Sequence, residues 1–445
     1  MAGLKFIHAA DIHLGSTIQL PQLDISKQQE ELLEQANYNA FSYIVETAIA
    51  QEVDFLLLAG DVYDQQQRSI KANQFFKQQC QKLAEAEIAV YIIAGNHDPL
   101  NSRQQLFAQP DNVYEFSGQE VEEYQIASNN GLVANIIGQS YQYQSESEAL
   151  HLEYQSSKQN LFNIALLHTQ LEAGESNYVP ATKNELMQKQ MIDYWALGHI
   201  HQCRIEHKMD PAIAYPGIPQ GRDFGEQNLG GCFLVEVGEN HQIDYSFVPT
   251  SNFVWQRREI SLQDQAETPS NLDQLIELIQ QQAQELAATY PQIPYGLKTV
   301  NQDWQDNFVA YLIEWNITGA GEIHQILREQ PEEAAESLIT SLNQLDYSPQ
   351  QVITAGIKFN TRAPMPSLEE LKSNNQVFAE LSNVLKLCDS DLEQELKEEL
   401  GEIWSQNVDH EDVDPTTFQL TTEAYQDILK QAKNLIIEEV LERRD

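Results

Sequence analysis

The sequence has few basic side chains for its length. Among its 445 residues there are 26 lysines and arginines against 67 aspartates and glutamates, which leaves a net charge of −41 at pH 7. A surface of this charge repels a polyanion such as DNA at long range. The composition therefore excludes a protein that grips nucleic acid with its whole surface, but it leaves room for a local site that binds phosphate through metal ions.

Cysteines and long hydrophobic runs are scarce as well. The four cysteines form no Cys-x-x-Cys pair. Apolar runs such as Phe55–Ala59 are far shorter than the roughly 20 residues that a membrane-spanning helix needs. The first residues lead directly into a predicted strand, Leu4–Ala9, without a secretory leader. We therefore expect reduced thiols, no membrane segment and a cytoplasmic location.

Short apolar runs alternate with helical patterns over residues 1–250. Continuous apolar strands of this kind are buried on both faces of a sheet, so the pattern predicts an α/β layered domain. The predicted strands are Leu4–Ala9, Phe55–Ala59, Ile88–Ala94, Leu132–Ile137, Phe162–Leu167, Tyr194–Leu197 and Cys232–Val237, and the predicted helices are Lys27–Ala50 and Ser69–Ala86.

The pattern changes after Pro249. A predicted helix, Leu272–Ala288, two long predicted strands, Phe308–Ile317 and Val352–Phe359, and two helical segments between the strands indicate a smaller α+β unit. Beyond Pro366 the sequence is almost wholly helical. We predict a first domain over 1–250, a smaller α+β domain over 260–365 and a helical C-terminal region over 366–445.

An apolar stripe runs along the helix predicted for residues 416–443. Its members, among them Tyr425, Ile428 and Leu435, recur at intervals of roughly three or four residues, which is the helical period. Such a stripe either packs on its own protein or docks a partner, and the sequence leaves both readings open.

Most of the predicted strands in the first domain end in a residue type that binds metals. Ligands of open α/β sheets bind outside the carboxyl ends of the strands, so five separate segments are expected to meet at one rim. Of the 11 histidines in the chain, 5 lie in these segments, which makes a chance arrangement improbable. The residues are Asp11 and His13, then Asp61 and Asp64, then Asn96, His97 and Asp98, then His168, and finally His199 and His201.

Carboxylate, amide oxygen and imidazole donors without a thiolate suit Mn²⁺, Fe²⁺ or Zn²⁺ better than Ca²⁺. Seven residues supply these donors and are too many for one ion with an open position: Asp11, His13, Asp61, Asn96, His168, His199 and His201. Two ions that share the carboxylate of Asp61 fit the set better, and a pair of metals roughly 3.5–4 Å apart can clamp a phosphate for in-line attack.

The ordered motifs Asp-x-His, Gly-Asp, Gly-Asn-His-Asp, a single His and Gly-His-x-His resemble the signature of the calcineurin-like metallophosphoesterases. The stretch Phe6–Gly15 is similar to the start of SbcD-type nuclease subunits in the DNA-repair exonuclease branch, whereas Tyr194–His199 and Tyr215–Gly217 resemble the YhaO group more closely. The resemblance implies a β-sandwich flanked by helices, with a smaller α+β capping domain and a helical C-terminus.

The same resemblance implies roles for the candidate residues. It implies two divalent ions, which we expect to be manganese, and a metal-bound hydroxide that attacks phosphorus directly. His97 would stabilise charge beside the scissile phosphate, and Asp64 would orient His97. The implied ligands are Asp11, His13 and His201 for the first ion and Asn96, His168 and His199 for the second, with Asp61 bridging both.

Three further residues lie outside this set of implied ligands and catalytic groups. Arg222 lies in a loop predicted near the rim, where it either binds substrate phosphate or forms an internal salt bridge. Asp98 is better explained as a turn or helix cap than as a catalytic group. His8 precedes the first motif inside a strand, so we expect it to be a packed core residue.

Three functions are compatible with the sequence. The first is a DNA exonuclease or endonuclease of DNA repair, the nuclease subunit beside an SbcC-like coiled-coil ATPase that binds the C-terminal helices. Related nucleases also pair through helices of the catalytic domain, so the resemblance also allows a homodimer. The second function is a phosphodiesterase for small substrates, and the third is a non-catalytic scaffold for the ATPase.

Overall fold

The computed structural model describes residues 3–18, 20, 27–64, 69–102, 106–127, 131, 133–156, 161–172, 178–208, 210–238, 240–300 and 303–364. The predicted helical region 366–445, with its docking helix at 416–443, lies outside these residues. The chain divides into one compact unit of Met1–Thr318 with Ile326–Asn360 and a second of Gly319–Gln325 with Thr361–Asp445. No helix in the described part of the chain has the length and apolar character that crossing a bilayer requires.

The first sheet contains the strands that open the chain. Its central strands β1, β2 and β3 run parallel, with Phe6 beside Phe55 and Phe55 beside Ala89, and β11 joins β1 in the antiparallel direction. In spatial order the sheet consists of β14 (Lys298–Thr299), β12 (Ile243–Pro249), β11 (Gly231–Val237), β1 (Leu4–Ala9), β2 (Phe55–Ala59), β3 (Ala89–Ile93) and β4 (Val113–Glu115).

The second sheet is parallel in its centre and antiparallel at its edges. Strands β6, β7, β8 and β10 run in one direction, while β5 and β9 pair with their neighbours in the opposite sense. In spatial order its strands are β5 (Glu122–Ala127), β6 (Val133–Gly138), β7 (Phe162–His168), β8 (Tyr194–Gly198), β10 (Ala212–Tyr215) and β9 (Arg204–His207).

The two sheets pack face to face. Side chains alternate along β1, so Phe6 and His8 point to one face and Ile7 to the other. The ring of Phe6 meets that of Tyr194 edge to face at 5.5 Å, and Nδ1 of His8 lies 2.9 Å from the hydroxyl of Tyr194. These contacts join β1 of the first sheet to β8 of the second. The predicted β-sandwich is confirmed, and His8 is the packed core residue that was expected.

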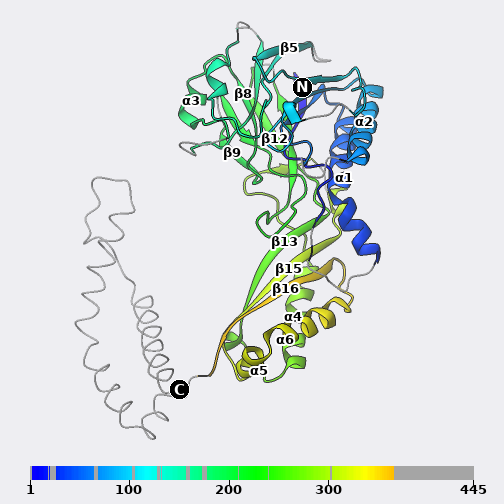
Figure 1. Cartoon of the computed structure of the whole chain (residues 1–445), viewed down its shortest axis with the longest axis vertical. Coiled ribbons are helices and arrows are strands. Elements are labelled where there is room, and N and C mark those ends of the chain that lie inside the picture. Colours follow the sequence, from blue (N-terminus) through cyan, green and yellow to red (C-terminus); the bar gives the residue numbers. More distant parts are fainter. Residues whose placement is uncertain are drawn as a thin grey trace, which may run out of the picture. The chain divides into compact units, whose positions relative to one another are not determined.

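Helices cover the outer face of the first sheet (Figure 1). Helices α1 (Lys27–Ala50) and α2 (Ile70–Glu85) pack their apolar sides on it, and Phe41 stacks on Phe76 where they meet, at 5.6 Å. Ser69 begins α2 by accepting a hydrogen bond from the amide of Ala72, as an N-cap does. Both predicted helices are therefore present, and the sheet is buried on both faces.

Shorter elements cover the outer face of the second sheet. Trp195 of β8 is fully buried there against Tyr154, 5.6 Å away, and Leu186 of helix α3 (Lys183–Met187) belongs to the same apolar cluster.

The short 3-10 helices in the described part of the chain are η2 (Leu100–Ser102), η3 (Leu150–Glu153), η4 (Leu262–Asp264) and η5 (Asp303–Asn307).

A third, three-stranded sheet follows along the chain. Its order is β13 (Phe253–Ser261), β15 (Ala310–Ala320) and β16 (Gln351–Arg362). Helices α4 (Leu272–Ala287) and α6 (Pro331–Asn343) pack together and bury apolar side chains such as Leu275 and Leu338, and α5 (His324–Glu329) precedes α6. This is the α+β character that the sequence predicts.

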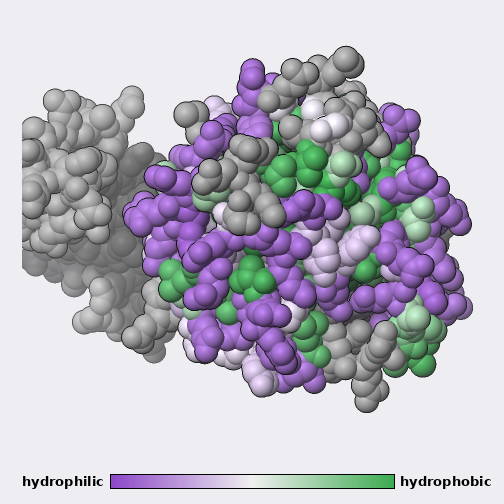
Figure 2. Space-filling model, turned by 90° about the horizontal axis from the view of Figure 1, so that it is seen from above, coloured by the Kyte–Doolittle hydropathy of each residue, from purple (hydrophilic) through white to green (hydrophobic). Residues whose placement is uncertain are grey.

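Strands β13 and β14 show which sheets the chain joins near and beyond the domain boundary predicted between residues 250 and 260. Strand β13 enters the third sheet at Phe253, where it pairs with Ala310, and β14 joins the first sheet beside β12 although it lies far along the chain. The division into domains at 1–250, 260–365 and 366–445 stays a prediction. The face shown in Figure 2 is largely hydrophilic with separate small apolar patches, as the net charge of −41 leads one to expect.

Candidate metal centre

The loops that follow β1 and β2 continue side by side beyond the sheet. The amide of Asp11 donates to the carbonyl of Gly60 at 3.0 Å, and the amide of His13 donates to the carbonyl of Asp61 at 3.0 Å. Asp11, His13, Asp61 and His199 have φ values of 53°, 48°, 51° and 93°, a region that side-chain-bearing residues seldom adopt. This strained backbone is held by the neighbouring loops and turns the four side chains over the rim.

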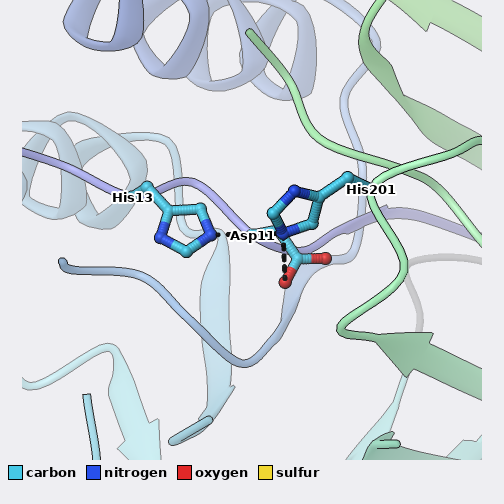
Figure 3. A group of neighbouring side chains, drawn as sticks. All are labelled: Asp11, His13 and His201. Atoms are coloured by element: carbon cyan, nitrogen blue, oxygen red, sulfur yellow. Dashed lines mark hydrogen bonds and ion pairs between the residues drawn. The ribbon is translucent and has the colours of Figure 1, made fainter. Parts of the chain in front are cut away.

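One group of donors comes from the loops after β1 and β8 (Figure 3). Nε2 of His201 lies 3.4 Å from Nε2 of His13 and 3.9 Å from Oδ1 of Asp11. Both carboxylate oxygens of Asp11 also accept from the amide of His199 at 3.1 Å, which fixes the carboxylate in place. The three donor atoms lie within 4.8 Å of one another, which is compact enough to hold a metal ion.

A second group adjoins the first. Nε2 of His168 lies 3.0 Å from Oδ1 of Asn96 and 3.3 Å from Oδ2 of Asp61, while Nδ1 of His199 lies 3.1 Å from the same oxygen of Asn96. Donor atoms of Asp11, Asp61 and His168 also lie within 4.8 Å of one another. The structure thus brings together all seven residues that the sequence named as ligands, with Asp11 and Asp61 where the two groups adjoin.

The hydrogen bonding of His168 leaves a place for a cation. Its Nδ1 lies 2.9 Å from the carbonyl oxygen of Ala59, which can only accept, so Nδ1 carries a proton. Burial opposes a charge on His168, but the adjacent Asp61 carboxylate raises the pKa of His168 to about 9, so a proton on Nε2 faces the acceptor oxygens of Asn96 and Asp61. These three atoms require a proton or a metal ion between them.

Burial sets the protonation of the other groups. It lowers the pKa of His13 well below the usual range and, aided by the charge of His168, lowers the pKa of His199 to about 3. Burial opposes the charge of Asp61, but the adjacent His168 outweighs it and holds the pKa of Asp61 below the usual range. Neutral imidazoles and ionised carboxylates are the forms that bind metals.

Glycine is needed where the loops approach most closely. A Cβ atom added to Gly95 would lie 2.2 Å from Oδ1 of Asp61, and one added to Gly198 would lie 2.0 Å from the carbonyl oxygen of Ala59. Both contacts are far shorter than two atoms tolerate. The glycines in the Gly-Asn-His-Asp and Gly-His-x-His motifs are therefore there for space, and the donor atoms could not converge without them.

His97 and Asp64 lie beside the first group. The ring of His97 meets the ring of His13 edge to face at 4.9 Å, and ring nitrogens of both histidines lie within 4.8 Å of a carboxylate oxygen of Asp64. The amide of His97 donates to Oδ1 of Asp61 at 2.8 Å. Asp98 accepts from the amides of Val62 and Gly95, which fits the structural role expected for it.

Arg222 lies next to the centre and is held by an acidic partner. Its guanidinium donates to Oε1 of Glu226 at 2.7 Å and lies 3.9 Å from Oδ2 of Asp64. Glu226 also lies 2.6 Å from Nδ1 of His201. Burial opposes the charge of Glu226, but hydrogen bonds from His201 and Arg222 hold its pKa below the usual range.

Comparison with known proteins places the chain in a family. A sequence model described as calcineurin-like phosphoesterase matches residues 4–203. The metallophosphoesterase YhaO of Bacillus subtilis is 35% identical over 282 residues, which are 62% of this chain and 67% of that protein. The chain belongs to the calcineurin-like phosphoesterase family. It is therefore a hydrolase of the metal-dependent phosphoesterase class.

More distant relatives of the phosphoesterase include archaeal proteins. The DNA double-strand break repair protein Mre11 of Methanocaldococcus jannaschii is 27% identical over 247 residues, which are 53% of this chain and 63% of that protein. A solved dimetal phosphatase from Danio rerio is matched over 56% of this chain and 100% of its own, with 12% identity and a TM-score of 0.32, values too low for a structural conclusion. The chain thus spans about two thirds of the two curated relatives.

Members of this family bind divalent metals, and the rim of the phosphoesterase fits such ions. Its donors are oxygen and imidazole nitrogen, as Mn²⁺, Fe²⁺ and Zn²⁺ accept. Nδ1 of His13 is buried without a hydrogen-bond partner among the described residues. A buried polar atom without a partner costs free energy unless a ligand supplies the missing partner.

Three residues near the centre escape sequence reasoning. Glu226 is missed because nothing in the sequence signals its approach to His201. The hydroxyl of Tyr141 donates to the carbonyl of His168 at 2.8 Å, and the ring of Tyr178 lies 4.8 Å from that of His199. None of them belongs to a strand-end motif, so only the folded chain shows that they support the rim.

Proposed function

We propose that the phosphoesterase is a metal-dependent DNA nuclease, an exonuclease or endonuclease, that acts in DNA repair. The observation that carries the proposal is the convergence of seven oxygen and imidazole donors at one rim of the sandwich, with His97 beside them. The similarity to archaeal Mre11 repair proteins supports DNA as the substrate.

We assign the donors to two Mn²⁺ ions. Asp11, His13 and His201 would hold the first ion, Asn96, His168 and His199 the second, and Asp61 would bridge them. The adjoining donor groups around Asp11 and Asp61 support this division. Two bound divalent ions would lower the pKa of a water molecule and stabilise negative charge on the phosphate oxygens.

The remaining residues of the centre act on the phosphate itself. We propose that His97 donates a hydrogen bond to a non-bridging oxygen of the scissile phosphate and is ready to protonate the leaving oxygen. Asp64 would orient the ring of His97. Arg222 is a candidate substrate contact because its positive charge lies beside Asp64, although Glu226 already holds part of its guanidinium.

We further propose a cytoplasmic complex with an SbcC-like coiled-coil ATPase that binds helices of the 366–445 region, and a catalytic domain that pairs with a second copy. A net charge of −41 opposes contact with DNA, so a partner would have to supply much of the basic surface. The three domains would then be the nuclease domain, the capping domain and the partner-binding region.

The nuclease assay tests this proposal directly. We expect the full chain to degrade end-labelled DNA with Mn²⁺ and to lose all activity when EDTA removes the ion, because the donors at the rim have no other means to activate water. Gel analysis of the labelled products measures the rate. Degradation that persists in EDTA after gel filtration would contradict the metal dependence.

The negative charge also favours a second candidate, a phosphodiesterase for small substrates. Charge repulsion grows with the number of phosphates in the substrate, so a dinucleotide suffers less from it than duplex DNA does. Cleavage of a dinucleotide or a cyclic nucleotide, together with intact linear DNA at the same metal and enzyme concentrations, would select this candidate over the nuclease.

Replacing Glu226 with glutamine tests how the first ion is held. The carboxylate accepts from Nδ1 of His201 at 2.6 Å, which leaves Nε2 free to bind a metal. Loss of that charge is expected to weaken binding of one ion by about tenfold to a hundredfold while the fold is kept. Titration with Mn²⁺ followed by calorimetry measures the effect. Equal affinities in wild type and Glu226→Gln would show that His201 needs no such support.

A further inference from the structure

A groove of about 600 Å³ is lined both by residues of the metal centre and by the turn that precedes β14. His201 and Glu226 belong to the metal centre, and Arg204, Lys208 and Tyr295 also line the groove. Its volume lies in the range of pockets that bind ligands of nucleotide size, about 300–1,000 Å³. Because two of the residues that line it belong to the metal centre, a ligand bound in the groove lies next to that centre.

A tight turn displays Tyr295 beside the groove. The amide of Leu297 donates to the carbonyl of Pro294 at 3.2 Å, and Gly296 has a φ of +78°, so residues 294–297 form a β-turn of type II geometry. Tyr295 is the residue at the apex, and its relative exposure is 106%. The turn therefore holds an aromatic ring in water, where it contributes nothing to the core.

The charges along the groove differ from those of the chain as a whole. Arg204 and Lys208 are both exposed, and Arg204 forms a surface ion pair with Glu206 at 3.4 Å. The carboxylate of Glu226 is already engaged by Arg222 and His201. The groove thus offers two exposed cations, one of them paired with Glu206 on the same groove, in a protein whose net charge is −41.

We propose that this groove binds an unpaired strand of nucleic acid, with a base stacked on Tyr295 and its phosphates near Arg204 and Lys208. The inference rests on the proposed function and names the part of the substrate that the site grips. Stacking does not depend on charge, so an exposed tyrosine can hold a strand that the acidic surface would otherwise repel. Two cations alone would not overcome that repulsion at physiological salt.

Equilibrium binding tests the proposal without turnover. Fluorescence anisotropy of a labelled single-stranded oligonucleotide, with EDTA present and the full chain, gives the dissociation constant. We expect Tyr295→Ala to weaken binding by about tenfold or more at every salt concentration, because a stacking contact is lost. Tyr295→Phe keeps the ring and is expected to bind like the wild type. Lys208→Gln is expected to reduce the salt dependence of binding instead.

A matched control separates this proposal from the proposed function. Tyr143 is also exposed, at 58%, but does not line the groove, so Tyr143→Ala is expected to bind the strand as tightly as the wild type. Equal affinity of Tyr295→Ala and the wild type, or no binding by either, would overturn the groove assignment. Hydrolysis of bis(p-nitrophenyl) phosphate with Mn²⁺, a substrate without a nucleotide chain, reports the metal centre separately.

Discussion

Replacing His97 with alanine is expected to lower phosphodiester hydrolysis by about a hundredfold or more while the metal ions stay bound. The size follows from the usual contribution of a positioned acid or hydrogen-bond donor, roughly 10²–10⁴ in rate. Rates on end-labelled DNA and metal content by elemental analysis measure the two parts of the prediction.

The expectation that metal stays bound has a structural reason. The part of His97 that touches the Asp61 carboxylate is its backbone amide, which donates to Oδ1 of Asp61 at 2.8 Å and is kept by any substitution except proline. The ring itself meets His13 at 4.9 Å between centroids without taking a place among the seven donors. His97→Gln is a useful companion, because it keeps a hydrogen-bond donor without a titratable group. A His97→Ala protein that cleaves DNA at the wild-type rate would remove His97 from the mechanism.

Replacing Asp61 with alanine is expected to strip both metal ions from the protein. Its carboxylate lies 3.3 Å from Nε2 of His168 and, with Asp11, belongs to a compact donor group. A side chain that bridges both ions, as we propose for Asp61, cannot be lost without weakening both, and we expect a loss of affinity of about a hundredfold or more at each site. Elemental analysis after dialysis gives the metal content of each variant.

Two variants control for the fold and for the bridging role. Asp61→Asn keeps the shape and an acceptor oxygen for the amide of His97 but removes the charge. His13→Ala removes a donor from one group only and is expected to cost one ion. Circular dichroism confirms that each variant is folded. Asp61→Ala protein that keeps two equivalents of metal would refute the bridging role, and loss of one equivalent would assign Asp61 to a single ion.

The first half of the fold was accessible from the sequence for a physical reason. Strands such as Phe55–Ala59 are buried on both faces, so their apolar runs are continuous and unmistakable. Strand β5 was missed because exposed and half-buried residues alternate along it, and a short edge strand of that kind resembles a loop. Strand β14 has only two residues and is defined by its pairing with β12.

The donor set was equally accessible, because it follows from one rule about strand ends. Asp11, Asp61, Asn96, His168 and His199 each follow a strand, and parallel strands end at a common rim. Their convergence also depends on the face-to-face packing of the two sheets, because β1, β2 and β3 belong to the first sheet and β7 and β8 to the second. The glycines at 95 and 198 can also be read from the motifs, although only the distances show what they make room for.

The sequence by itself determined the continuous buried strands, the candidate donors and the family, because local hydrophobic pattern and motif order encode them. The tertiary structure alone decided what surrounds those donors. Glu226 reaches His201, Tyr141 holds the carbonyl of His168, and the exposed Tyr295 lines the same groove as His201 and Glu226 of the metal centre. These approaches arise between segments distant along the chain, and they depend on loop paths that no local pattern of side chains specifies.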